Sequence, residues 1–146
     1  MTVRRIGLVG CVKEKASTRS AAADLYGSTL FMGRRIFVER SCGEWWILSA
    51  AHGLVAPTTM LDPYDLALKD LGRAARRTWS DAVLAAIDEH IAPHPGDVFE
   101  IHAGSEYRDF GLVDGLSARG CRVENPTDGL RIGEQLRFYG RTAGGS

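Results

Sequence analysis

Four side chains in this sequence could donate, accept or stabilise charge during a reaction near neutral pH. His52 and His102 each lie at or just after a short apolar run, where an imidazole could protonate or hydrogen-bond a leaving group. Asp62 and Asp128 stand in segments containing proline, where a carboxylate could activate water or stabilise an oxocarbenium-like transition state. We take these four residues as the candidate catalytic groups.

Cationic, aromatic and small residues beside them could bind a ligand. Lys13 and Lys15 could each hold a phosphate or carboxylate as a point charge. Tyr64 offers a flat wall for an aromatic ring, and Arg108 could clamp an anion with two hydrogen bonds. The predicted binding residues are Cys11, Lys13, Lys15, Ser49, Tyr64, Gly104, Tyr107 and Arg108.

The usual motifs for cofactors and metals are missing. The sequence contains neither the Walker pattern G-x-x-x-x-G-K-[ST] nor G-x-G-x-x-G, which disfavours ATP or NAD binding by the usual devices, and we predict no cofactor. Cys11, His52 and His102 include no C-x-x-C or H-x-x-x-H pair, so we predict no metal. A buried thiol at Cys11 is favoured over a nucleophile.

Four segments have the composition of β-strands: Arg5–Gly10, Glu44–Ser49, Val98–Gly104 and Cys121–Glu124. The first is apolar without alternation, which is typical of a central parallel strand covered on both faces. We expect the spatial order second, first, third, fourth. The fourth is short and more polar, which indicates an edge strand. A long loop is expected from Ala50 to Asp65, a length that is often functional.

Apolar residues at helical spacing follow each strand. Ser20 could cap the first helix, and the clearest helix runs from about Ala74 to His90 with Trp79 and Val83 on its buried stripe. The order strand–helix, four times over, predicts a single α/β domain over residues 5–140. We expect it to be doubly wound, with a mostly parallel four-stranded sheet and helices on both faces. Residues 141–146 are predicted to form a flexible tail.

The candidate residues collect after the predicted strands. In open α/β sheets, ligands bind outside the carboxyl ends of the strands, near the point where strand order reverses. Residues with polar or small side chains follow all four strands, whereas the opposite edge carries ordinary turn residues. The sequence therefore predicts a ligand site at the carboxyl edge of the sheet.

The amino-acid composition limits which classes of protein this chain could belong to. The 146 residues are 45% hydrophobic and 25% charged, with a formal net charge of zero, as in an ordinary globular domain without a global field for nucleic acid or membrane. No apolar run approaches the ~20 residues of a membrane span, and no apolar signal segment is present. We expect a cytoplasmic protein without a membrane partner. Its three cysteines, odd in number, are expected to be reduced.

Several short motifs together resemble a bacterial and phage domain family of unknown function, and they are distantly similar to the peroxide-stress YaaA proteins. The motifs are Val9-Gly10-Cys11-x-Lys13-x-Lys15, Ala23-x-Leu25-Tyr26, Leu48-Ser49-Ala50-x-His52-Gly53-Leu54, Asp62-Pro63-Tyr64 and Ala103-Gly104-x-x-Tyr107-Arg108. The resemblance covers most of residues 6–139. It implies an α/β domain linked to nucleotides, modified bases or nucleic acid. At the level of fold alone, the pattern is also similar to uracil-DNA glycosylases.

We therefore expect an enzyme that acts on a nucleoside, nucleotide or modified base, by hydrolysis of an N-glycosidic bond. One alternative is a nucleic-acid-binding module without catalysis, which would use Arg73, Arg76 and Arg77 together with the loop lysines. Most arginine clusters of this kind are simply a solvated helix face, and that explanation is favoured here. The other alternative is a small-ligand-binding accessory protein with the same pocket.

Overall fold

A five-stranded sheet organises the chain. The computed structural model describes residues 3–10, 19–25, 28–62, 64 and 66–144, with side chains to 141. The strands lie in the order β4-β3-β1-β6-β7. Their bounds are β1 (Arg5–Gly10), β3 (Glu44–Ser49), β4 (Gly53–Val55), β6 (Val98–His102) and β7 (Arg122–Glu124). β1 pairs in parallel with β3 on one side and with β6 on the other, and β7 adds in parallel to β6. The order expected for the four parallel strands is therefore confirmed.

The predicted strand count is wrong, because β4 adds a fifth, antiparallel strand. Gly53 adopts a left-handed backbone with φ +70°, which glycine reaches without steric penalty. The chain then reverses and pairs Leu54 with Leu48 and Val55 with Ile47. The predicted long loop from Ala50 is thus partly strand. Its later part holds β5 (Met60–Leu61), which pairs with β2 (Ser20–Ala21) in a separate two-stranded sheet.

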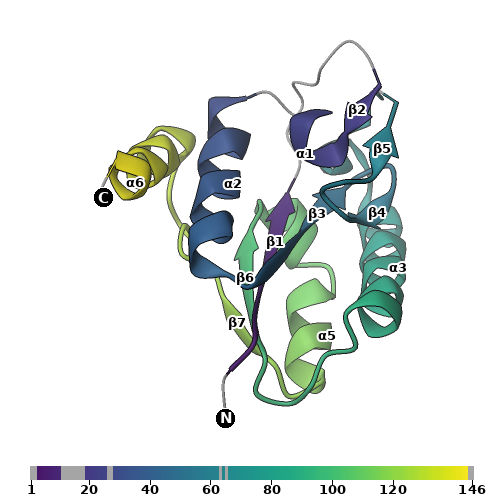
Figure 1. Cartoon of the computed structure of the whole chain (residues 1–146). Helices are drawn as coiled ribbons and strands as arrows, with labels where there is room; N and C mark the ends of the chain where they lie inside the picture. The colour runs from purple at the N-terminus through teal and green to yellow at the C-terminus, as the bar shows by residue number, and fades with distance from the viewer. Residues whose placement is uncertain (1–2, 11–18, 26–27, 63, 65, 145–146) are drawn as a thin grey trace.

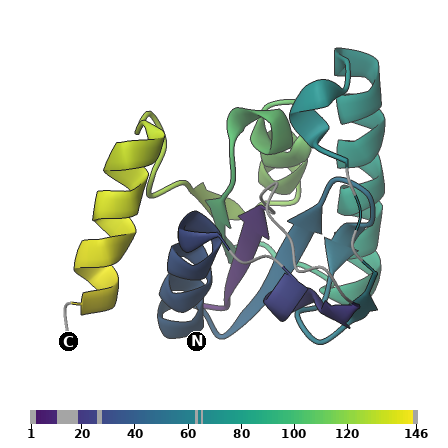
Figure 2. The ribbon, with the colours of Figure 1, turned by 90° about the horizontal axis from the view of Figure 1, so that it is seen from above.

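Helices cover both faces of the main sheet (Figures 1 and 2). One face carries α2 (Thr29–Ser41), with α6 (Ile132–Gly144) packed on its outer side. The other carries α3 (Arg73–His90) and α5 (Leu112–Ala118), which contact each other. α6 extends to Gly144, into the segment that the sequence predicts to be a tail. No described helix is both long and apolar enough to cross a membrane.

The first helical region begins later than predicted. Ser20 lies in β2, and the short α1 (Ala22–Leu25) follows it. The cap of α2 is Ser28, whose hydroxyl accepts a hydrogen bond from the Phe31 amide at 3.1 Å. Gly33 does not end this helix. A side chain there would lie 2.7 Å from Tyr139 Cβ, so the missing side chain lets α6 approach α2 closely.

The single turn α4 (Ser105–Arg108), which follows β6, borders the pocket described below. α5 comes after it, beyond Gly111 with φ +125°. A short 3-10 turn, η1 (Leu68–Asp70), contacts α4 from the loop before α3. The core lies between the sheet and its helices, and it includes the predicted stripe of α3 at Trp79, Val83 and Ile87.

Candidate functional site

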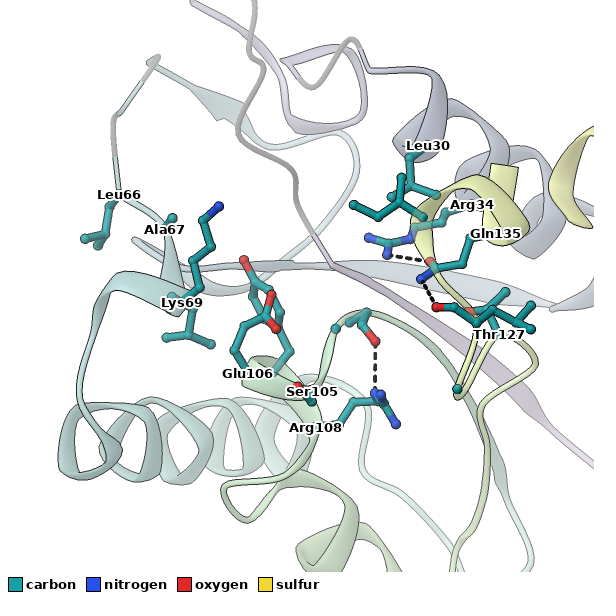
Figure 3. Close-up of a pocket in the computed structure, with 17 residues that line it drawn as sticks. Leu30, Arg34, Leu66, Ala67, Lys69, Ser105, Glu106, Arg108, Thr127 and Gln135 are labelled. Carbon is teal, nitrogen blue, oxygen red and sulfur yellow. Dashed lines mark hydrogen bonds between the residues drawn. The ribbon is translucent and has the colours of Figure 1, made fainter. Parts of the chain in front are cut away.

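A pocket of about 510 Å³ opens beside the carboxyl ends of β1 and β6 (Figure 3). These two strands are central, and chain connections leave them in opposite directions along the sheet, so the pocket lies where the strand order reverses. Its polar side chains are Arg34, Lys69, Ser105, Glu106, Arg108, Thr127 and Gln135, and its larger apolar ones are Leu30, Leu66, Leu130 and Ile132. The volume is that of a small-molecule site.

Charges of opposite sign face each other across this pocket. Figure 3 shows Lys69 and Glu106 on one side, from η1 and α4, and Arg34 with Gln135 on the other, from α2 and α6. Arg108 lies along a third side, but its Nε donates to the Ala103 carbonyl at 2.9 Å and its Nη1 to Asp128 at 3.1 Å. Two donor groups of Arg108 are therefore already hydrogen-bonded within the protein.

Arg34 is the most unusual of these groups, because its side chain is buried within α2. It lies on the same face as Phe31 and Val38, at the i+3 and i+7 spacing of a buried helical stripe. Nη1 donates to the Gly10 carbonyl at 3.2 Å, and Nη2 donates to Gln135 Oε1 at 3.3 Å. Burial disfavours the charged form and lowers the pKa of Arg34 from its ordinary value.

The carboxylate of Glu106 bends back over Gly104. A side chain at position 104 would lie 2.6 Å from Glu106 Oε2, so glycine is what leaves room for the carboxylate at the pocket wall. Gly104 itself has an ordinary φ of −71°. Its predicted membership of the site thus has a steric reason that the sequence did not supply.

The structure brings three of the predicted binding residues to this pocket. Gly104, Tyr107 and Arg108 line it. Tyr107 is buried, and its ring meets Trp79 edge-on with the centroids 5.2 Å apart. Asp128, a predicted catalytic group, is exposed and bound to Arg108.

His102 does not line the pocket. Its side chain is fully buried on the face of the sheet that α2 and α6 cover, 5.0 Å from the ring of Phe37. Nε2 lies 2.7 Å from Glu100 Oε1, and Nδ1 lies 2.6 Å from the Tyr139 hydroxyl. Side chains of a strand alternate between faces, and this one points between the layers.

The Glu100 carboxylate anchors a buried polar network. It accepts hydrogen bonds from His102, from Arg5 at 2.7 Å and from the Ser41 hydroxyl at 3.0 Å. Burial alone would raise the pKa of Glu100, but the hydrogen bonds from His102 and Arg5 outweigh it, and its pKa falls to about 2. This carboxylate is ionised at neutral pH.

Three other predicted residues form a separate cluster beside β3 and β4. The Ser49 and Tyr64 hydroxyls are 2.7 Å apart, and the His52 amide donates to Ser49 Oγ at 3.1 Å. The His52 ring meets Tyr64 edge-on, with centroids 5.3 Å apart. None of the three lines the pocket. Trp79 links this cluster to the pocket. Its Nε1 donates to the Ser49 carbonyl at 2.9 Å, and its ring contacts Tyr107, which lines the pocket.

The remaining predictions fall outside the pocket or outside the described residues. Asp62 is exposed and pairs with Arg19 at 3.3 Å. Cys11, Lys13 and Lys15 lie outside the described residues. Within the described part of the chain, no group of three or more His, Cys, Asp or Glu side chains could hold a metal ion.

Sequence reasoning missed Arg34, Lys69, Glu106 and Gln135 as pocket residues. One signal for Arg34 was available: it falls on the apolar stripe of its helix, three residues after Phe31 and four before Val38. A cation at such a position is rarely buried without a reason. Glu106 stands within the Ala103–Arg108 motif, but its direction depends on the turn at Gly104.

Comparisons with known proteins identify a family but no characterised relative. Neither the curated proteins nor the solved structures include a match. The model of DUF6884, a family of unknown function, matches residues 6–141, which include every described residue of the pocket. The expected membership in a family of unknown function is thus confirmed: the chain belongs to DUF6884.

Proposed function

We propose that this protein is an enzyme that acts on a nucleoside, nucleotide or modified base, and that it hydrolyses the N-glycosidic bond. The observation that carries the proposal is the opposition of the Glu106 carboxylate and the buried Arg34 guanidinium across one pocket (Figure 3). Such a pair can bind an anionic substrate at one end and stabilise positive charge at the other.

The lining suits a nucleoside-sized ligand. Leu30, Leu66 and Leu130 offer apolar surface to a planar base, and the polar side chains of the lining can hydrogen-bond a sugar or phosphate. Sites for small molecules combine apolar surface with polar groups that fix orientation. The sequence suggested that Tyr64 would pack against the base, but Tyr64 does not line the pocket. In this proposal the leucines pack against the base instead.

The chemistry asked of Glu106 is that of a carboxylate in sugar hydrolysis. The C1′–N bond breaks and its electron pair stays on the base nitrogen, which takes a proton from water. Positive charge develops on the sugar, where a nearby carboxylate stabilises it. As the oxygen of the attacking water bonds to C1′, Glu106 accepts a proton from that water. It then gives this proton to the hydroxide that was left when the base nitrogen was protonated, so the products are a free base, a free sugar or sugar phosphate, and Glu106 as a carboxylate again. Glu106 thereby replaces Asp62 and Asp128 as the proposed catalytic carboxylate.

The test is release of free base, followed by chromatography, from a panel of nucleosides and nucleoside monophosphates. We expect Glu106→Gln to lower the rate about 10²- to 10⁴-fold while substrate still raises the melting temperature. Glu89→Gln, which removes an exposed carboxylate on α3, is the matched control and keeps full activity. Unchanged release in the Glu106 variant, or no release from any substrate, contradicts the proposal.

The nucleic-acid-binding alternative has weaker support. Of its three helix arginines, Arg76 is occupied: it donates to the carbonyls of Leu68 and Lys69 and lies over the Phe110 ring. Arg73 and Arg77 are exposed. Affinity for nucleic acid that falls steeply with salt, without base release, would favour this alternative. The similarity to YaaA proteins stays a prediction and adds no weight to either function.

A further inference from the structure

Arg34 is a buried cation without an anionic partner among the described residues. The residue is only 6% exposed. Its guanidinium donates to three neutral acceptors: the Gly10 carbonyl, the Gln135 amide oxygen and the Tyr139 hydroxyl. The next residue, Arg35, shows the usual arrangement: it is nearer the surface and pairs with Asp24 and Glu39. Arg34 Nε has no hydrogen-bond acceptor in the described part of the chain.

This arrangement is unfavourable in the free protein. Removing a charge from water costs several kcal/mol unless an opposite charge compensates it. Neutral acceptors orient the guanidinium, and Glu106 acts on its charge only from across the pocket. Burial therefore still lowers the pKa of Arg34. An anion in the adjoining pocket would supply the missing charge. The burial that makes the free state costly also strengthens that attraction, because a low local dielectric screens it less.

The surrounding network holds Arg34 in place. The Glu100 carboxylate can only accept, so His102 Nε2 donates to it, and in the neutral imidazole Nδ1 accepts from the Tyr139 hydroxyl. The oxygen of Tyr139 then accepts from Arg34. His102 thus has a place in the site as a positioning residue, through Tyr139, although it does not touch the pocket. A receptor held by such partners is ordered before the ligand arrives.

We propose that Arg34 is the phosphate receptor of this pocket, and that the ligand is a nucleoside monophosphate rather than a nucleoside or free base. This rests on the proposed function and names its substrate class. A phosphate monoester, which carries a charge between −1.5 and −2 near pH 7, would compensate the positive charge of Arg34. Lys69 and Glu106 lie on the opposite side of the pocket, where Glu106 faces the sugar.

The first experiment measures affinities of the intact protein by calorimetry and thermal shift. The probes are the common ribo- and deoxyribonucleoside 5′-monophosphates, the matching nucleosides, and inorganic phosphate. Hydrogen bonds to a charged group predict that the best monophosphate binds about 10- to 100-fold more tightly than its nucleoside. Equal affinities overturn the inference. If inorganic phosphate binds but no nucleoside monophosphate displaces it, the inference is overturned as well.

The second experiment replaces Arg34 by methionine, which is similar in length and apolar. The preference for monophosphate over nucleoside should disappear, and the melting temperature of the free protein should stay the same or rise, because an uncompensated buried charge is gone. Arg35→Gln removes the same charge from the same helix and is the matched control, with the preference intact. A purely structural Arg34 predicts the reverse: a lower melting temperature and an unchanged preference.

The outcomes separate this inference from the proposed function. Monophosphate binding without release of base supports the phosphate receptor and contradicts the hydrolase. Base release at equal efficiency from nucleosides and monophosphates supports the hydrolase and overturns the receptor. If Arg34→Met does not fold, the affinity ratio of the unmodified protein for monophosphate and nucleoside decides.

Discussion

Glu100 and His102 lie two residues apart on β6, share one face of the sheet, and are joined by a 2.7 Å hydrogen bond between carboxylate and imidazole. Both side chains are buried, at 1% and 0% exposed. Arg5 and Tyr139 extend the pair into a chain of contacts from the start of β1 to α6. His102, which the sequence suggested as a catalytic group, therefore lies in a buried network that joins β1, β6 and α6.

Acid should destabilise the protein through Glu100. Its pKa is about 2 in the fold and 4.5 ordinarily, so the unfolded chain binds more protons between these values. The stabilisation, about 3 kcal/mol, is present above pH ~5 and is lost as pH falls toward 2. Urea denaturation across this range should show the loss, and Glu100→Gln should flatten it. Glu124→Gln, which removes the other partner of Arg5, serves as the control. A Glu100→Gln protein with an unchanged pH profile would refute the assignment.

Gly33→Ala should separate α2 from α6. The added carbon would lie 2.7 Å from Tyr139 Cβ, so the helices must shift, at a cost of about 1 to 3 kcal/mol in the free energy of unfolding. Gly140→Ala is the matched control, since nothing lies within 4 Å of its added carbon and alanine favours helices by up to about 1 kcal/mol. Denaturation curves of the two variants should therefore move in opposite directions. Equal gains in stability would show that the α2–α6 contact is looser than described.

Cys42 should react slowly in the native state. Burial is the main cause that raises its pKa to about 11, against an ordinary 9.0. Since only the thiolate is nucleophilic, alkylation at pH 7.5 should be about 100-fold slower than for an ordinary thiol. Timed labelling with iodoacetamide and mass spectrometry of the Cys42 peptide would measure the rate, with the urea-unfolded protein as reference. Native and unfolded rates that coincide would contradict the burial of this thiol.

His52→Ala and Asp62→Asn should leave base release unchanged. Both side chains are exposed, neither lines the pocket, and Asp62 pairs only with the exposed Arg19 among the described residues. Surface substitutions of this kind usually change stability by less than about 0.5 kcal/mol. Rates measured beside Glu106→Gln provide the comparison. A large loss in either variant would move the catalytic centre to the cluster of Ser49, His52 and Tyr64.

The sheet was readable from the sequence because its strands are apolar runs of ordinary length. Arg5–Gly10 lacks alternation and does lie at the centre, and the carboxyl edge does carry the pocket. β4 was missed because it is three residues long and depends on one left-handed glycine, Gly53, which local pattern does not reveal. The split of the first helical region follows from pairing between Ser20 and Leu61, a contact over long sequence distance.

The position of the pocket was predicted better than the residues that line it. Spacing along the chain shows that His102 ends a strand, but not which face of the sheet its ring enters. That face is decided by Glu100, Phe37 and Tyr139, which come from three different elements. Arg34 was overlooked because helix patterns assign cations to solvent by default. Only the tertiary structure shows that its hydrogen-bond acceptors are neutral.

The central position of β1 has a consequence for how the protein is made. Among the strands of the main sheet β1 is synthesised first, yet its register pairs Ile6 with Glu44 on one side and with Phe99 on the other. Until β6 leaves the ribosome, one edge of an apolar strand stays open to other chains. Nascent chains that stop short of β6 should therefore depend on chaperones, whereas chains extended past it should not.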